Sequence, residues 1–145
     1  MIMTKREIKK MFAVSCENKG DYIRIIVEGE GTLENSMQIH QEIITLLGDT
    51  DKKLALIDIS RLVGRLSMAD SIRRAEAIPL EIRGKMVRTA MLEDHENMVF
   101  AYKEEMAMVN RGIKIKIFFD SEKAIEWLLQ DEHARKSHAV ETKSR

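Results

Sequence analysis

The 145-residue sequence has little cysteine, little proline and no excess of charge of either sign. Cys16 is the only cysteine, so the chain cannot form an internal disulfide, and it lacks the cysteine pairs of a structural zinc site. One proline and seven glycines are too few for a long disordered linker. Basic residues number 24, as do acidic residues. This balance argues against a nucleic-acid or anionic-membrane binder, since both need an excess of positive charge.

Long apolar runs are also missing. No stretch approaches the roughly 18 apolar residues of a membrane span, and the first residues lack the apolar run of a signal peptide. We therefore expect no membrane span and a cytoplasmic protein. The length suits one domain that folds without metal or disulfide. We place this domain at residues 11–130, after an N-terminal extension (1–10) and before a polar C-terminal tail (131–145).

Strand and helix periods alternate along the first half of the chain. Short β runs at 11–16 and 22–27 flank a turn with Asn and Gly, which predicts an antiparallel hairpin. Thr32 is the expected N-cap of a helix that ends at Gly48. One face of that helix is predicted from spacings of three and four, at Leu33, Met37, His40, Ile44 and Leu47.

The second half continues the alternation. Residues 53–59 are nearly all apolar, which is typical of a strand covered on both faces, and 60–66 are expected to form a loop. A capping box at Ser67 opens a helix to about residue 77, and 86–92 form the next strand. The following helix is expected to bury one face, made of Met98, Tyr102, Met106 and Val109. Residues 113–117 alternate isoleucine with lysine, as an edge strand does, and a short helix capped by Asp120 or Ser121 follows.

These elements define the fold class. Their order is ββαβαβαβα, and each strand–helix–strand step favours a right-handed crossover that makes the later strands parallel. The prediction is an α/β domain with a mixed, mostly parallel five-stranded sheet and about four helices.

Three segments carry a resemblance to a known family: 54–60 (LALIDIS), 85–92 (KMVRTAML) and 117–128 (IFFDSEKAIEWL). With the element order over 11–129, they resemble the STAS family, the domain of anti-sigma-factor antagonists and of sulfate-transporter tails. More narrowly, the chain is similar to the stand-alone bacterial branch described as STAS-like or lipid-transfer-like. The resemblance implies the STAS fold, with four helices packed on a mostly parallel sheet.

The resemblance also implies a candidate phosphorylation site. Regulatory STAS proteins carry Asp-Ser-Ser-Gly at the start of the second helix, where a partner kinase phosphorylates a serine. Only Asp70-Ser71 matches here, because Ile72 and Arg73 replace the second Ser and the Gly. Ser71, and after it Ser67, are therefore candidates for phosphorylation or anion binding near a helix N-terminus. In the alternative interpretation Ser67 is only a cap and Ser71 a surface residue.

Other residues are candidates for ligand or partner contact. Asp58 lies near the end of a buried strand, where it either accepts hydrogen bonds from the next loop or serves as an acid or base. Ten methionines are unusual, and a flexible thioether suits a surface that accepts varied apolar ligands, although ordinary core filling explains them too. The candidate contact residues are Asp58, Ser60, Leu62, Met68, Met91, Met98 and Met106.

No catalytic motif is present in the sequence, such as a P-loop or a nucleophile elbow. We expect no enzyme, no cofactor and no metal. The leading hypothesis is a non-enzymatic STAS-like interaction or regulatory module with a protein partner, which forms a homodimer through the edge strand at 113–117 or the first hairpin. Two alternatives stay open: a carrier or sensor of a small apolar ligand or lipid, and a phospho-switched anti-sigma-factor antagonist.

Overall fold

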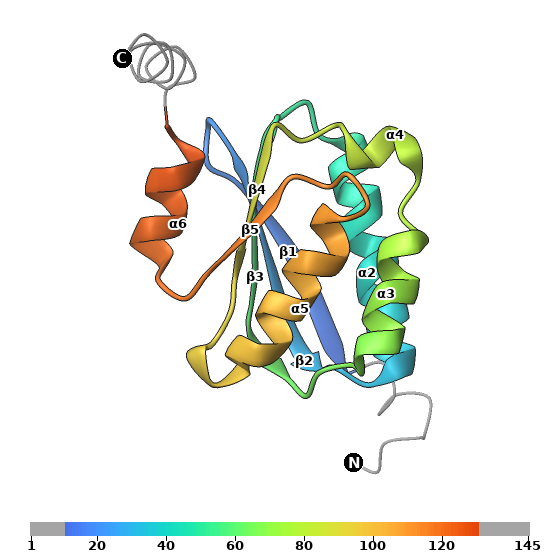
Figure 1. The fold of residues 1–145 in the computed structure, drawn as a ribbon. Helices are drawn as coiled ribbons and strands as arrows, with labels where there is room; N and C mark the ends of the chain where they lie inside the picture. The colour runs from blue at the N-terminus through green and yellow to red at the C-terminus, as the bar shows by residue number, and fades with distance from the viewer. Residues whose placement is uncertain (1–10, 131–145) are drawn as a thin grey trace, which may run out of the picture.

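A computed structural model describes residues 11–130, and the expected N-terminal extension and C-terminal tail lie outside this range. Figure 1 shows the chain path. The elements are β1 (Phe12–Asn18), β2 (Ile23–Glu30), α2 (Leu33–Asp49), β3 (Leu54–Val63), α3 (Met68–Glu76), α4 (Leu80–Arg83), β4 (Arg88–Leu92), the 3-10 turn η1 (His95–Asn97), α5 (Met98–Val109), β5 (Ile115–Phe118) and α6 (Ser121–Leu128).

The five strands form one sheet in the order β1-β2-β3-β4-β5. β1 pairs with β2 antiparallel, and the other neighbours are parallel. This confirms the predicted α/β class and the mixed, mostly parallel sheet. β3 is the central strand and buries five consecutive residues from Ala55 to Ile59, as its apolar run predicts. β5 lies at one edge of the sheet and β1 at the other.

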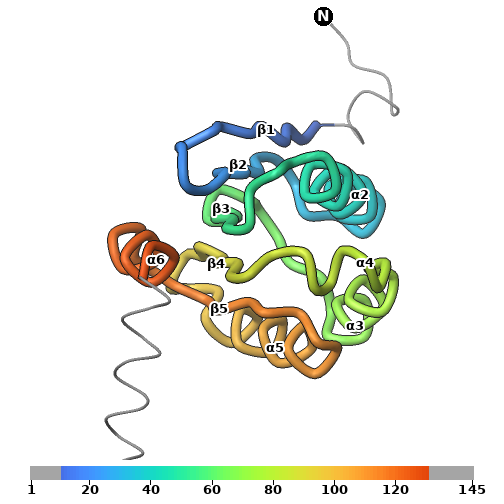
Figure 2. Tube along the Cα trace, turned by 90° about the horizontal axis from the view of Figure 1, so that it is seen from above, coloured from blue at the N-terminus to red at the C-terminus, as the bar shows by residue number. Residues whose placement is uncertain are grey.

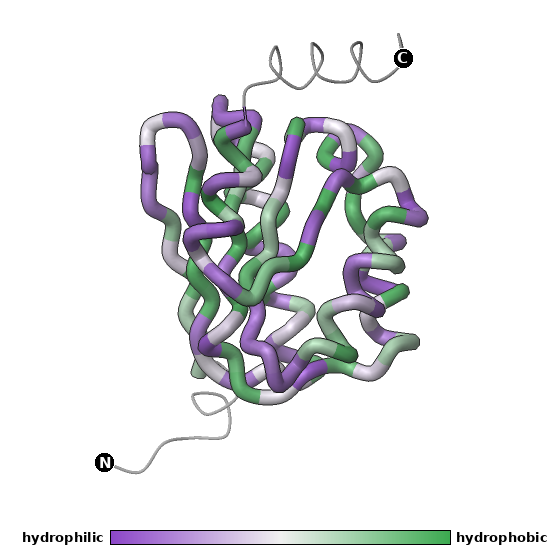
Figure 3. Tube along the Cα trace, turned by 60° about the vertical axis from the view of Figure 1, so that its left-hand side comes forward, coloured by the Kyte–Doolittle hydropathy of each residue, from purple (hydrophilic) through white to green (hydrophobic). Residues whose placement is uncertain are grey.

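The helices cover the two faces of the sheet unequally. α2, α3, α4 and α5 lie on one side and α6 alone lies on the other (Figure 2). The larger core, around Ile25, Ile57 and Ile117, packs under the four helices, while Leu56 and Leu128 belong to a smaller core under α6. Figure 3 shows hydrophobic and hydrophilic residues interspersed along both strands and helices. The cavity described below lies on the side of the four helices.

Side-chain caps fix where three helices begin. Thr32 accepts from the backbone N–H of Asn35, Ser67 from that of Asp70, and Asp120 from that of Lys123. Each bond satisfies one of the N–H groups that a helix start leaves without a partner. The predicted caps at Thr32 and Ser67 are confirmed, and Asp120 rather than Ser121 caps the last helix.

Several predicted boundaries are wrong. β3 runs on to Val63, so the first half of the expected 60–66 loop is strand, because the backbone stays paired with β2 beyond a bulge. β4 and β5 each begin two residues later than predicted, at Arg88 and Ile115. The expected helices correspond to α2, α3, α5 and α6, and the short α4 and η1 are additional.

The predicted face of α5 is also wrong, and that of α2 is right only in part, since His40, Ile44 and Leu47 do face the interior between helices and sheet. On α5 the side chains of Tyr102, Met106 and Val109 are exposed, with Met106 at 61%. The buried residues of α5 are Ala101, Glu104, Ala107 and Met108. On α2 the first two members of the predicted face, Leu33 and Met37, are exposed, and Asn35, Ser36 and Ile39 are buried instead. Both helices are apolar on more than one side, so periodicity alone did not decide which side packs on the sheet.

A candidate ligand cavity between the helices and the sheet

An apolar cavity of about 100 Å³ lies between the sheet and helices α2 to α5. Its floor comes from β3 and β4 and its walls from the helices. Most of its lining is aliphatic, aromatic or methionine: Ile39, Ile43, Ile57, Ile59, Leu62, Ile78, Ile82, Met86, Met91, Phe100 and Met108. Apolar walls around a closed space are the usual surroundings of a small-molecule site.

Polar residues also line the cavity. They are Ser36, Arg65, Arg83, Thr89 and Lys114, together with His40 from α2, Arg74 from α3 and Glu104 from α5. Arg74 Nη2 donates to Glu104 Oε1 at 2.8 Å, and the side chains are 14% and 3% exposed. This is one bond where a guanidinium and a carboxylate can make two. Within residues 11–130, Arg74 Nε, Glu104 Oε2 and His40 Nε2 are buried without a hydrogen-bond partner. We call these three residues the cavity triad.

Burial controls the charge of His40. The pKa of His40 falls from 6.5 to about 4, mainly because of burial and also because of the neighbouring positive charge of Arg74, against a smaller opposing effect of a hydrogen bond to the Arg74 backbone. His40 is therefore neutral at pH 7. The cavity triad then carries one positive and one negative charge, which balance.

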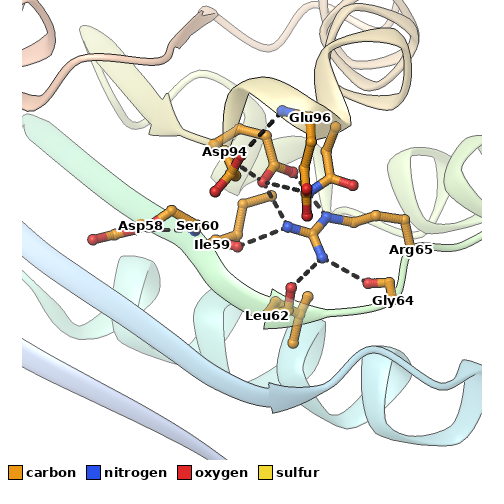
Figure 4. Close-up of polar contacts among 10 residues, drawn as sticks. Asp58, Ile59, Ser60, Leu62, Gly64, Arg65, Asp94 and Glu96 are labelled. Carbon is orange, nitrogen blue, oxygen red and sulfur yellow. Dashed lines mark hydrogen bonds and ion pairs between the residues drawn. The ribbon is translucent and has the colours of Figure 1, made fainter.

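A buried ion pair joins Arg65, one of the residues that line the cavity, to Glu93; Figure 4 shows the polar contacts of Arg65. Arg65, in the loop after β3, donates from Nε to Glu93 Oε2 at 2.8 Å, and the two side chains are 8% and 0% exposed. The Arg65 guanidinium also donates to the carbonyls of Ile59, Leu62 and Gly64. Glu93 also accepts from the backbone N–H of Asp94. We call this arrangement the Arg65 clasp; it ties the end of β3 to the end of β4.

Comparison with solved structures identifies the architecture. An uncharacterized protein from Shewanella loihica PV-4, of the DUF3478 family with a SpoIIAA-like fold, matches with a TM-score of 0.52 and 22% identity, over 81% of this chain and 94% of that one. An anti-sigma factor antagonist from Mycobacterium paratuberculosis matches with a TM-score of 0.56 and 10% identity, over 83% and 97%. This chain has the SpoIIAA-like fold. No family model matches the sequence, and no curated protein does.

The SpoIIAA-like fold is the STAS fold that the sequence resemblance implied. The candidate phosphorylation residues of that resemblance lie at the start of α3. Ser71 is 1% exposed, so a kinase cannot reach its hydroxyl in this conformation, and the expectation of a surface residue is wrong. Ser67 is exposed, and its side chain is engaged as the α3 cap and as a donor to Asp70 Oδ2 at 3.1 Å.

Asp58 lies on the other face of the sheet from the cavity. Side chains alternate along β3, and Ile57 and Ile59 line the cavity, so Asp58 points away from it. Its side chain is 4% exposed and pairs with Arg24 at 3.2 Å. It also accepts from the backbone N–H and the hydroxyl of Ser60, at 3.0 and 2.6 Å. These contacts match the expectation that Asp58 accepts hydrogen bonds from the chain that follows it.

The remaining candidate residues separate into three places. Leu62 and Met91 line the cavity. Met68 packs on the main core. Met98 and Met106 are 37% and 61% exposed on α5 and lie outside the cavity. The methionine pattern therefore pointed to the cavity only in part.

Neither a metal centre nor a spanning helix is found in the described structure. No group of three His, Cys, Asp or Glu side chains in residues 11–130 is placed to hold a metal ion. Asp94, at the start of η1, caps that turn by accepting from the Glu96 N–H. Over the same residues, none of the helices has the length and apolar character to cross a bilayer.

The sequence reasoning missed the cavity triad. Arg74 and Glu104 are 30 residues apart, and each sits among other charged residues on its helix. His40 was assigned to an apolar helix face without a role. The only available signal was a histidine on an otherwise aliphatic stripe, which does not by itself indicate a ligand.

Proposed function

We propose that this protein binds a small apolar ligand between its helices and its sheet, as a carrier or sensor. The observation that supports this most is the cavity itself, because well-packed interiors contain few voids larger than a water molecule. Its lining is rich in isoleucine and methionine, side chains that accept apolar ligands of varied shape.

The volume limits what fits. Small-molecule sites usually measure roughly 300–1,000 Å³, whereas an engineered apolar cavity of about 150 Å³ binds benzene. At about 100 Å³ this cavity suits a ligand about the size of a single aromatic ring with at most a small substituent. A longer chain requires the walls to move. α4 is the element to move first, since it has four residues and none of them is buried.

A binding experiment with a filled cavity tests the proposal. Native mass spectrometry of freshly purified protein looks for a co-purifying ligand, and calorimetric titration with toluene measures the affinity of the emptied protein. Ile59→Phe fills the cavity and should abolish toluene binding. The matched control is Ile26→Phe on the other face of the sheet, which should leave it intact. Absence of binding of both toluene and phenol to the unaltered protein would rule the proposal out.

A second candidate function is self-association as an interaction module. The fold is shared with an anti-sigma factor antagonist, and β1 offers an open edge. Within residues 11–130 the outer edge of β1 is unpaired. β1 spans seven residues, contains neither lysine nor proline, and exposes most of its residues, whereas β5 is four residues long and carries Lys116. Lysine on a short strand discourages edge-to-edge pairing. The occupant that suits the β1 edge is therefore β1 of a second copy.

Light scattering coupled to size-exclusion chromatography tests this association. A dimer at high concentration is the expected result. Ser15→Lys, which places a lysine on the exposed edge strand, should return the protein to monomer, while Gln41→Lys on the exposed side of α2 should not. A monomer at all concentrations would remove this second function and leave ligand binding untouched.

A further inference from the structure

The cavity triad has hydrogen-bonding capacity that the described protein leaves unused. Glu104 Oε2 accepts nothing, Arg74 Nε donates to nothing, and His40 Nε2 has no partner in residues 11–130. The Glu104 side chain is 3% exposed, so bulk solvent does not compensate for the missing bond. A buried polar atom without a partner is costly, and native proteins rarely keep several together without a reason.

The three atoms belong to neighbouring side chains from three helices. Arg74 joins Glu104 through its single hydrogen bond, and it lies close enough to His40 to repel that ring's proton. All three residues line the cavity. The unused groups therefore form one polar spot in a mostly apolar wall, with both a donor and an acceptor.

The charge of this spot decides between classes of ligand. The positive charge of Arg74 is already balanced by Glu104, and neutral His40 adds none. A ligand carboxylate or phosphate at this spot would place its negative charge beside the carboxylate of Glu104, which is costly where water is excluded. A hydroxyl brings no charge, accepts from Arg74 Nε and donates to Glu104 Oε2 or His40 Nε2.

We infer that the cavity takes an apolar ligand with an uncharged head group that both donates and accepts a hydrogen bond, such as a hydroxyl, held by Arg74, Glu104 and His40. This inference rests on the proposed function, since it specifies the ligand of the same cavity. It makes the triad a specificity determinant: a ligand without the hydroxyl leaves the polar spot unsatisfied, and an anionic ligand is repelled.

Phenol, toluene and benzoate test the inference, because they share one ring and differ in the group that would face the triad. A purely apolar cavity prefers toluene over phenol, since burial of an unpaired hydroxyl is costly. The triad reverses this order. We expect phenol to bind at least about tenfold more tightly than toluene in calorimetric titrations, because a site built to bond a hydroxyl discriminates strongly against its absence. Benzoate should bind more weakly than phenol.

The double variant Arg74→Met/Glu104→Met removes the polar spot while keeping both side chains long and apolar, a replacement that buried ion pairs often tolerate. It should prefer toluene. The comparison of phenol, toluene and benzoate in the unaltered protein tests the inference even if the double variant does not fold. If toluene binds more tightly than phenol, the inference is wrong and the proposed function still stands. This result is expected if water molecules already satisfy the hydrogen bonds of the triad. Benzoate binding most tightly overturns the uncharged class. Binding of none of the three defeats the proposed function itself.

Discussion

The buried histidine of the cavity makes stability depend on pH in a way that the structure quantifies. His40 binds its proton with a pKa of about 4 in the folded chain and about 6.5 in the unfolded chain. Between pH 6.5 and pH 4 the unfolded state therefore binds a proton at His40 that the folded state does not bind. Stability is full above pH 6.5 and is lost progressively down to pH 4.

The magnitude follows from the two affinities. Each tenfold difference in proton binding is worth about 1.4 kcal/mol, so the change from 6.5 to about 4 corresponds to a loss of about 3 kcal/mol. His40→Gln removes the titrating group and should remove this part of the pH dependence. Urea unfolding at a series of pH values between 7 and 4 measures the free energy of unfolding for both proteins.

Carboxylates also titrate at the acid end of this range, so the informative quantity is the difference between the two proteins. Gln41→His, which adds a histidine at an exposed position beside His40, is the matched control and should behave as the unaltered protein does. If the unaltered protein and His40→Gln lose the same stability between pH 6.5 and pH 4, His40 is not buried as described and the account of the cavity wall is wrong.

Three further predictions concern packing and can be checked by urea unfolding at pH 7. Arg65→Met leaves Glu93 buried without its cation and should cost about 3–5 kcal/mol, whereas Arg61→Met removes only an exposed pair and should barely change stability; equal losses would contradict the clasp. Leu128→Ala should cost about 2–5 kcal/mol, because this side chain is 0% exposed under α6; a negligible loss would mean that α6 is not docked. Met106→Lys should change stability by less than about 0.5 kcal/mol, since its side chain is 61% exposed, and a large loss would restore the face predicted from sequence.

Elements with a local cause were predicted well. The apolar run of β3 can be buried on both sides only in the middle of a covered sheet. Thr32 and Ser67 cap helices through hydrogen bonds to residues three positions away. The element order and the mostly parallel sheet followed from such local signals together with the handedness of crossovers.

Features decided by contacts between distant segments were not predictable in this way. On α5, Tyr102 and Met106 have larger apolar side chains than Ala101 and Ala107, yet the alanines face inward. Small side chains let the helix approach its neighbours closely, and that advantage is invisible until the neighbours are in place. Arg74 and Glu104 form their ion pair in the cavity wall only because α3 packs beside α5, and the sequence does not show this packing.

The Arg65 clasp shows the same limit. Arg65 was part of the segment 60–66, which was expected to form a loop. In the fold its guanidinium enters the interior and holds the ends of β3 and β4 together. An arginine in a loop can point into the interior only if a buried carboxylate is there to pair with it. Here that carboxylate is Glu93, which lies 28 residues further along the chain.

A crystal structure determined under xenon pressure offers the most direct check of the void on which ligand binding depends. Xenon enters closed apolar spaces of this size without needing a hydrogen bond. We expect a xenon atom between Ile57, Met91 and Phe100, under helices α2 to α5. Side chains that fill this space, with no xenon in it, would contradict the account.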